Sequence, residues 1–197
     1  MDLRNPQLID NLAAGRPVRL NVGAGAVDRP DRFSLDIRDL PGTDILADLE
    51  EPLDGLPDGS VEHIEAHHVL EHVDNLDQLL DEVHRVLTDD GTMDIRVPHW
   101  ANPLGYSDPT HVRLFGLYSF CYLVPLDAQP LGRKVPTYRE SHHFGINSLE
   151  LCFRRDNRFF SALENWLNSD PRRLEAYEKN LSNVIWPYEI HCVLAKR

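Results

Sequence analysis

The feature that most limits the fold is a change of hydrophobic period near residue 76. Before it, short apolar runs alternate with glycine, proline and aspartate turn signals, as in successive strands. From Leu76 to Leu87 apolar residues recur at helical spacing, residues 88–91 read as a helix stop, and residues 92–97 return to a strand pattern. Strands joined by a helix are typical of a parallel sheet, so we predict an α/β fold. The early strands are expected at residues 18–22, 32–37, 44–49 and 61–66.

The chain after Pro98 is richer in proline and aromatic residues, and its pattern is less regular. We expect loops and short helices up to residue 147. The remaining strands are expected at residues 149–154 and 189–195, and the remaining helices at 159–167 and 172–181, the second with Pro171 at its start.

Composition and charge narrow the class of protein. The 197 residues are 42% hydrophobic, which suits one domain with a buried core. The net charge of −12 disfavours nucleic acid and anionic membranes as partners. The run from Leu114 to Leu126 is too short to span a bilayer, and no basic and apolar leader opens the chain. Three widely spaced cysteines without a paired motif are typical of a reduced, cytoplasmic protein.

A glycine-rich loop directly follows the first of these strands. Gly23 and Gly25 let the backbone approach a ligand closely, because they carry no Cβ. Asp36 ends the next strand, where a carboxylate can accept both ribose hydroxyls of an adenosine. A nicotinamide dinucleotide would need a third glycine at Asp28, and a helix that the short connection cannot hold. The pattern therefore favours an adenosine ligand without phosphates.

Six runs in consistent order resemble the class I S-adenosylmethionine-dependent methyltransferases, and within them the compact type 11 group. They are residues 20–25, 33–37, 44–49, 57–61, 66–72 and 87–93. The likeness covers roughly residues 17–98. It implies a Rossmann-like, mostly parallel seven-stranded sheet of order 3-2-1-4-5-7-6, with the last strand antiparallel. The sequence departs from the group in having Asn21 for the usual acid, Val27 for the third glycine, and a shortened or missing helix between the first two strands.

The resemblance also implies the division of the chain and the roles of its residues. We expect a single methyltransferase domain over residues 1–197. Its parts would be a cofactor-binding half (17–98), acceptor-side loops or lid (99–148), and C-terminal strands and helices (149–197). The cofactor would be S-adenosylmethionine, converted to S-adenosylhomocysteine. Gly23 and Gly25 would lie beneath its methionine part, Asp36 would bind the ribose, Asp48 and Leu49 the adenine, and Ala66 and His67 would lie beside the sulfonium. Asn21 and Ile37 complete the expected cofactor-binding set.

Polar and aromatic residues after the strand that ends at Pro98 are the candidates for handling a methyl acceptor. A hydroxyl acceptor must lose a proton, and histidine is the usual base near neutral pH. We predict His111, oriented by Asp108, as that base, with His99 as the alternative. Each could equally be structural: His111 as a ring held by Asp108, and His99 as a cap at the end of a strand. Arg113 would hold an anionic acceptor or pair with Asp108. The other expected substrate-binding residues are Trp100, Tyr118, His142 and His143.

Three functions remain open from the sequence. The first is methylation of a small molecule, which we predict to occur on oxygen because histidine bases are available. The second is a methyltransferase-fold binding protein without activity. The third is a metal-dependent enzyme, although we expect no metal; it would use His67, His68, His72, His99 or His111. The acceptor cannot be named from the sequence, and an aromatic C-terminal half would suit a homodimer.

Overall fold

The computed structural model describes residues 1–25, 29–137, 144–154 and 158–197. By the density of contacts between residues, the chain divides into two compact units. The first holds Met1–Asp94 together with Ala195–Arg197, and the second holds Ile95–Leu194. The expected division at residue 98 and the expected single domain stay predictions.

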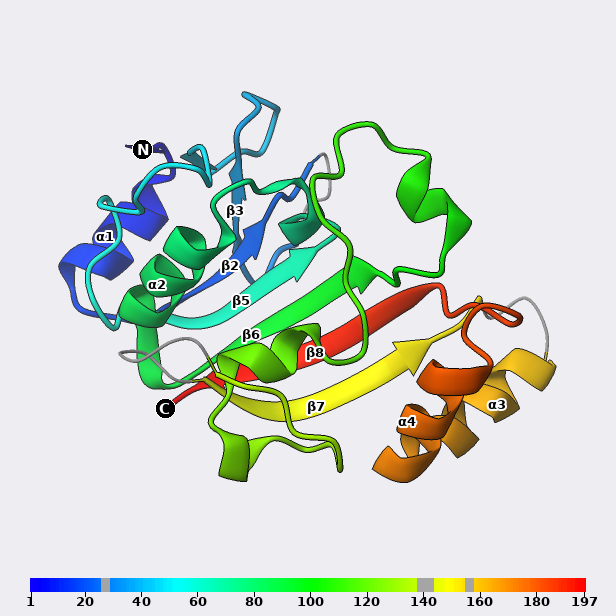
Figure 1. The fold of residues 1–197 in the computed structure, drawn as a ribbon. Helices are drawn as coiled ribbons and strands as arrows, with labels where there is room; N and C mark the ends of the chain where they lie inside the picture. The colour runs from blue at the N-terminus through cyan, green and yellow to red at the C-terminus, as the bar shows by residue number, and fades with distance from the viewer. Residues whose placement is uncertain (26–28, 138–143, 155–157) are drawn as a thin grey trace. The chain divides into compact units, whose positions relative to one another are not determined.

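The first unit is built on a mostly parallel sheet (Figure 1). Strands β2, β3 and β4 run parallel, and β5 is parallel to β2 on its other side. A short strand, β1, pairs antiparallel with β4 at the edge. The order is β1-β4-β3-β2-β5-β6. The bounds are β1 Asp2–Leu3, β2 Val18–Val22, β3 Phe33–Asp36, β4 Ile45–Leu46, β5 Val61–His67 and β6 Leu87–Pro98.

Two amphipathic helices belong to the first unit. Helix α1 (Pro6–Ala13) begins after Asn5, whose side chain accepts hydrogen bonds from two backbone N–H groups of the first turn. Helix α2 (Leu76–Val86) buries one apolar side at the spacing seen in the sequence: Leu79, Leu80, Val83 and Val86. A single 3₁₀ turn, Leu70–His72, precedes it. The helix expected from the period is therefore confirmed.

Two local expectations are wrong. Residues 88–91 are not a helix stop: α2 ends at Val86, the backbone is already extended at Leu87, and β6 runs through Gly91 to Pro98. Leu87 is completely buried, and its burial favours an extended backbone at this residue over a turn. The strand expected at 44–49 is limited to Ile45–Leu46. Strand β1 and helix α1 were not expected at all.

The second unit continues β6 and adds two long strands, in the order β6-β8-β7. Strand β7 is Phe144–Cys152 and β8 is Glu189–Lys196; β8 runs opposite to β7 (Figure 1). Strand β6 belongs to both units. If β1 is left out and the other seven strands are numbered along the chain, the sheet order is the expected 3-2-1-4-5-7-6, with an antiparallel last strand.

Helices and short turns fill the rest of the second unit. Helix α3 is Arg158–Asn168, and α4 is Pro171–Asn180 with Asp170 as its N-cap and proline in its first turn, as expected. Between β6 and β7 the helical segments of the described part are three 3₁₀ turns: Pro103–Tyr106, Ser119–Leu123 and Leu126–Ala128. An isolated parallel bridge joins His99 to Phe115. Within the described ranges, no helix is long and apolar enough to cross a membrane.

The connection between β2 and β3 is short, as the sequence indicated. Its described residues, 23–25 and 29–32, form turns and no helix. Strand side chains point alternately to the two faces of a sheet, so one face of β2, β5 and β6 here carries Arg19, His63, Glu65, His67, Thr92 and Asp94. In the usual doubly wound fold helices cover both faces. Here ion pairs occupy this part of the sheet.

Candidate functional site

The glycine loop after β2 has a backbone that only glycine tolerates. Gly23 has φ +63°, and its N–H donates a hydrogen bond to the carbonyl of Leu35 at 2.8 Å. A Cβ at residue 23 would lie 2.3 Å from Cγ2 of Val69. The side chain of Val69 therefore packs directly on the glycine, and the close approach that the sequence suggested is first of all an approach to this valine.

Asp36 links the glycine loop to the end of β3. Its Oδ2 accepts the N–H of Gly25 at 2.7 Å, and its Oδ1 accepts the N–H of Arg38 at 2.8 Å. The side chain of Asp36 is buried. An ionised carboxylate offers about four acceptor positions, so two bonds from the backbone orient it and leave capacity for two hydroxyl donors.

A cavity of about 260 Å³ in the first unit is lined by Ile37, the residue that follows Asp36, and by Asp48. Ile37 lines it and is 63% exposed, an unusual position for a large apolar side chain. Asp48 also lines it, and its Oδ1 accepts the N–H of Glu50. Of the two residues expected to hold an adenine, Asp48 lines this cavity, whereas Leu49 is half-buried and is not part of the described lining. Ile37 belongs to the wider cofactor-binding set that the sequence predicts.

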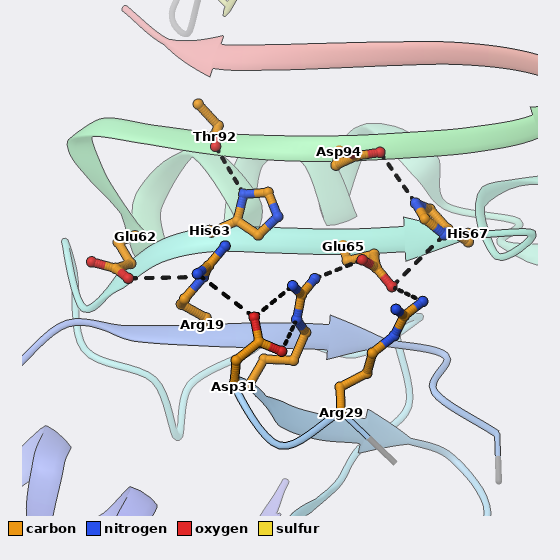
Figure 2. Close-up of polar contacts among 10 residues, drawn as sticks. Arg19, Arg29, Asp31, Glu62, His63, Glu65, His67, Thr92 and Asp94 are labelled. Atoms are coloured by element: carbon orange, nitrogen blue, oxygen red, sulfur yellow. Dashed lines mark hydrogen bonds and ion pairs between the residues drawn. The ribbon is translucent and has the colours of Figure 1, made fainter. Parts of the chain in front are cut away.

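His67, at the end of β5, lies between two carboxylates (Figure 2). Its Nε2 is 3.1 Å from Oδ1 of Asp94, and its Nδ1 is 3.7 Å from Oε1 of Glu65. Ala66 beside it is completely buried. The ring is therefore held by residues of its own and the next strand, in an acidic environment that suits a nearby positive charge.

Glu65 is the centre of the ion pairs in Figure 2. Its side chain is only 10% exposed, and it accepts from Arg32 at 2.6 Å and from Arg29 at 2.9 Å. Both arginines come from the short connection between β2 and β3. Asn21, also buried, stands next to Glu65 in the register of the paired strands. These ion pairs hold the end of the β2–β3 connection that precedes β3. Asp36 holds its other end, after β2, through Gly25.

His63, two residues before Glu65, occupies the same face of the sheet. Its Nδ1 is 2.9 Å from the hydroxyl of Thr92. Burial, together with the charges of Arg19 and Arg32, lowers the pKa of His63 below its usual value. The ring is neutral at pH 7, and its contact with Thr92 joins β5 to β6.

In the second unit, His99 is part of a buried contact with α4. The ring is completely buried; its Nδ1 accepts the N–H of Ala101 at 3.1 Å, so Nε2 carries the proton and donates to Glu178 at 2.9 Å. Trp100 donates its indole N–H to the other oxygen of Glu178. Both ring nitrogens of His99 are engaged in these contacts, and its role as the alternative base stays a prediction.

Glu178 is the residue that holds this segment. It also accepts the backbone N–H of Leu117, and burial alone would raise its pKa. The hydrogen bonds from His99 and Trp100 outweigh that effect and leave the pKa of Glu178 below the usual glutamate value. The sequence did not point to Glu178, because its partners lie far away along the chain.

His111 lies in a loop with a cavity of about 350 Å³. Its Nδ1 donates to the carbonyl of Gly105 at 2.8 Å, which makes Nε2 the basic nitrogen of the neutral ring. Asp108 is 3.9 Å from that Nε2 and is itself bonded to the N–H and hydroxyl of Thr110. Gly105, rather than Asp108, therefore orients the ring. Arg113 lines the same cavity.

The remaining expected acceptor residues lie apart from this loop or outside the described residues. The hydroxyl of Tyr118 donates to Glu175 of α4 at 3.0 Å, and Arg133 lies over its ring. Burial raises the pKa of Tyr118 to about 12, so the hydroxyl stays protonated and clamps the loop to the helix. His142 and His143 fall outside the described residues.

Several known proteins are similar to this chain in sequence or in fold. Residues 31–95 match the family model described as a methyltransferase domain. A methyltransferase from Archaeoglobus fulgidus, whose structure is described as SAM-dependent, is similar over 97% of this chain and 90% of its own, with 17% identity and a TM-score of 0.54. The fold is that of the class I methyltransferases. None of the curated proteins compared with the chain matches it.

Two other solved structures illustrate the range of class I methyltransferase folds. The plantazolicin methyltransferase BpumL, solved with a triazolic desmethylPZN analog and SAH, shares 14% identity over 97% of this chain and 83% of its own, with a TM-score of 0.51. The [4+2]-cyclase SpnF shares 16% identity over 96% of this chain and 78% of its own, with a TM-score of 0.53. The resemblance seen in the sequence is confirmed, and identities this low establish the fold alone.

Proposed function

We propose that this protein is an S-adenosylmethionine-dependent methyltransferase that acts on a small-molecule acceptor. The observation that carries the proposal is the Asp36 carboxylate, which is buried and oriented by the N–H groups of Gly25 and Arg38. The next residue, Ile37, lines a cavity together with Asp48. A carboxylate beside an exposed apolar side chain suits the ribose and base of an adenosine. The fold is supporting evidence, because a fold alone does not determine activity.

The donor set present in the first unit fits this cofactor. Asp36 would accept the ribose hydroxyls, and Ile37 and Asp48 would contact the face and edge of the adenine. Gly23, Gly25 and Asn21 would border the methionine part, with Ala66 and His67 near the sulfonium. Asp94 beside His67 adds a negative charge, whereas the charge of Glu65 is already balanced by Arg29 and Arg32. Leu49, half-buried and next to Asp48 in the chain, keeps its expected role as an adenine contact.

The bound cofactor would supply a methyl group activated by its positive sulfur. In O-methylation this methyl group would pass to the acceptor oxygen as its bond to sulfur breaks, with S-adenosylhomocysteine as the product. The acceptor's proton passes to Nε2 of His111, whose tautomer the Gly105 carbonyl fixes. Asp108, at 3.9 Å, stabilises the imidazolium until solvent takes the proton. Arg113 would pair with an anionic group of the acceptor.

Positioning supplies most of the rate of such an in-line displacement. His99, Trp100 and Tyr118 serve it indirectly in this proposal, because Glu178 and Glu175 hold them to α4. His142 and His143 stay proposed acceptor contacts on sequence grounds. We also propose a cytoplasmic location, no nucleic-acid or membrane partner, and a homodimer, on the charge and composition described above.

A catalytically inactive binding protein is the second candidate. Asn21, a neutral amide, is buried at the position where the resemblance leads one to expect an acid. Loss of that charge would weaken the hold on the cationic methionine part while leaving the adenosine site intact. Such a protein would bind S-adenosylhomocysteine and S-adenosylmethionine similarly and show no turnover. The two nitrogens of His67 face Asp94 and Glu65. A metal-dependent enzyme that uses the other histidines stays a third candidate, which metal analysis of the purified protein tests.

Titration calorimetry with both adenosyl compounds tests the proposal. The wild type, Asp36→Ala and a control, Asp39→Ala, would be compared; Asp39 is an exposed carboxylate that pairs with Arg4. We expect micromolar binding to the wild type and the control, and a loss of at least tenfold in Asp36→Ala. Equal binding by all three proteins, or none by the wild type at millimolar ligand, would refute the assigned site. Turnover on a panel of phenols and carboxylic acids separates an enzyme from the inactive binder.

A further inference from the structure

A separate cavity of about 350 Å³ lies within the second unit, away from the residues assigned above. It is formed where β7 ends, where α3 begins, and in the loop before β8. Its lining residues are Phe153, Arg154, Phe160, Val184, Ile185 and Trp186. Its volume is within the range of small-molecule sites, and in α/β folds ligands bind at the carboxyl ends of strands.

The walls of this cavity are aromatic and well supported. The rings of Phe153 and Phe160 lie parallel, with centroids 6.2 Å apart. Tyr177 of α4 packs edge-on against Phe153 from behind, at 5.7 Å. A wall of stacked rings backed by a helix keeps its shape when a ligand enters, and it offers flat surfaces that suit a flat molecule.

The rim of the cavity exposes apolar surface that nothing in the described unit covers fully. Val184 is 74% exposed, and Phe159, which packs on Phe160, is 61% exposed. Water-facing apolar surface of this kind, grouped around a cavity, marks a binding site more often than an isolated exposed residue does.

Arg154 places a positive charge at this rim. Its side chain is exposed, and its guanidinium carbon is 6.0 Å from the centre of the Tyr188 ring. A guanidinium matches the geometry of a carboxylate or sulfonate, and next to apolar walls its attraction is stronger than in open water. Because the whole chain carries a net charge of −12, a local cation is needed for any anion to bind here.

The backbone joins this cavity to the loop that follows β6. The N–H of Tyr188 donates to the carbonyl of Cys152, the strand residue next to Phe153. The carbonyl of Tyr188 accepts from the N–H of His99 and the side-chain amide of Asn102. A ligand that fixes residues 184–188 would therefore also steady the start of the segment that carries His111.

We propose that this cavity binds a planar, apolar ring compound that carries a carboxylate or sulfonate. The rings contact Phe153, Phe160 and Trp186, and the anionic group pairs with Arg154. The site does not depend on the proposed methyltransferase function, because it needs neither the cofactor nor the residues around Asp36.

The test uses 2-naphthoate and its neutral analogue 2-naphthalenemethanol, titrated without cofactor and followed by tryptophan fluorescence and calorimetry. In the wild type we expect naphthoate to bind at least tenfold more tightly than the alcohol. Arg154→Gln should lose about tenfold in naphthoate affinity and leave the alcohol unchanged, since charge-assisted hydrogen bonds are the stronger ones. Val184→Asp should weaken both ligands.

Arg172→Gln is the matched control. Arg172 lines another apolar cavity of the second unit, together with Trp166 and Leu181, so it reports whether the probe binds there instead. We expect this variant to bind like the wild type. The proposal is overturned if Arg172→Gln loses affinity while Arg154→Gln does not, or if the folded wild type shows no saturable binding at millimolar naphthoate. Circular dichroism confirms that each variant is folded.

Discussion

Replacing Gly23 by alanine tests how tightly the glycine loop is built. Two costs add at this position. A residue with a side chain at φ +63° pays about 1–2 kcal/mol for the left-handed backbone. The new Cβ would also lie 2.3 Å from Cγ2 of Val69, which is inside any allowed contact distance. Overpacking of this kind typically costs 1–3 kcal/mol. We therefore expect Gly23→Ala to lower the free energy of unfolding by about 2–5 kcal/mol.

Gly59→Ala is the control for the backbone cost. Gly59 has φ +62°, but a Cβ there would meet no atom within 4 Å. Its expected cost is about 1–2 kcal/mol, reduced by a few tenths because alanine restricts the unfolded chain. The difference between the two variants, about 1–3 kcal/mol, isolates the contact with Val69. In a chain of this size that difference corresponds to roughly 2–12 °C in Tm.

The measurement is urea unfolding of the wild type, both single variants and Gly23→Ala combined with Val69→Ala. Removing the valine's outer methyl groups relieves the contact, so the double variant should be less destabilised than the sum of the two single changes. Equal midpoints for Gly23→Ala and Gly59→Ala would refute the packing argument. Strict additivity of the Gly23 and Val69 changes would refute it as well, because it would mean that the two residues do not touch.

Three further variants test the charged contacts and the proposed base. Arg32→Gln should lower the free energy of unfolding by about 1–3 kcal/mol, because it leaves the nearly buried Glu65 short of a partner. Arg19→Gln removes a side chain that is 40% exposed and should lower it by less than about 1 kcal/mol; urea unfolding of the two variants measures the difference. Glu178→Gln should be less stable than the wild type at pH 7 by about 2 kcal/mol, and the gap should close as the pH falls below the usual glutamate pKa, because a lowered pKa stabilises only the ionised state. His111→Ala should bind S-adenosylhomocysteine within about twofold of the wild type and lose about 10²–10⁴ in turnover on a hydroxyl acceptor; unchanged turnover would reject it as the base.

Strands β2, β3 and β5 and helix α2 of the first unit were predictable because their signals are local. The period of α2 and the turn residues around β2, β3 and β5 lie within a few residues of the structures that they encode. The end of α2 was not predictable in the same way. Thr88, Asp89, Asp90 and Gly91 look like a turn in isolation, yet β6 begins at Leu87, because burial and pairing outweigh a local preference.

The same distinction applies to the candidate site. Asp36 and the glycine loop could be brought together from sequence, because both stand at the carboxyl ends of neighbouring parallel strands. The burial of His99 could not, since Glu178 lies on a helix 79 positions later in the chain. Alternation of His63, Glu65 and His67 along β5 was a missed signal: polar residues at every second position predict a sheet face without an apolar cover.

The polar face of β2, β5 and β6 affects how the glycine loop is held in place. A connecting helix would position the glycine loop by packing, but the described connection between β2 and β3 has turns only. Its near end is fixed by the bond from Gly25 to Asp36, and its far end by Arg29 and Arg32 on Glu65. Both anchors are carboxylates accepting N–H donors, and both are buried enough to resist screening by salt. The geometry of the proposed cofactor site therefore depends on the contacts of these two carboxylates rather than on the packing of a helix.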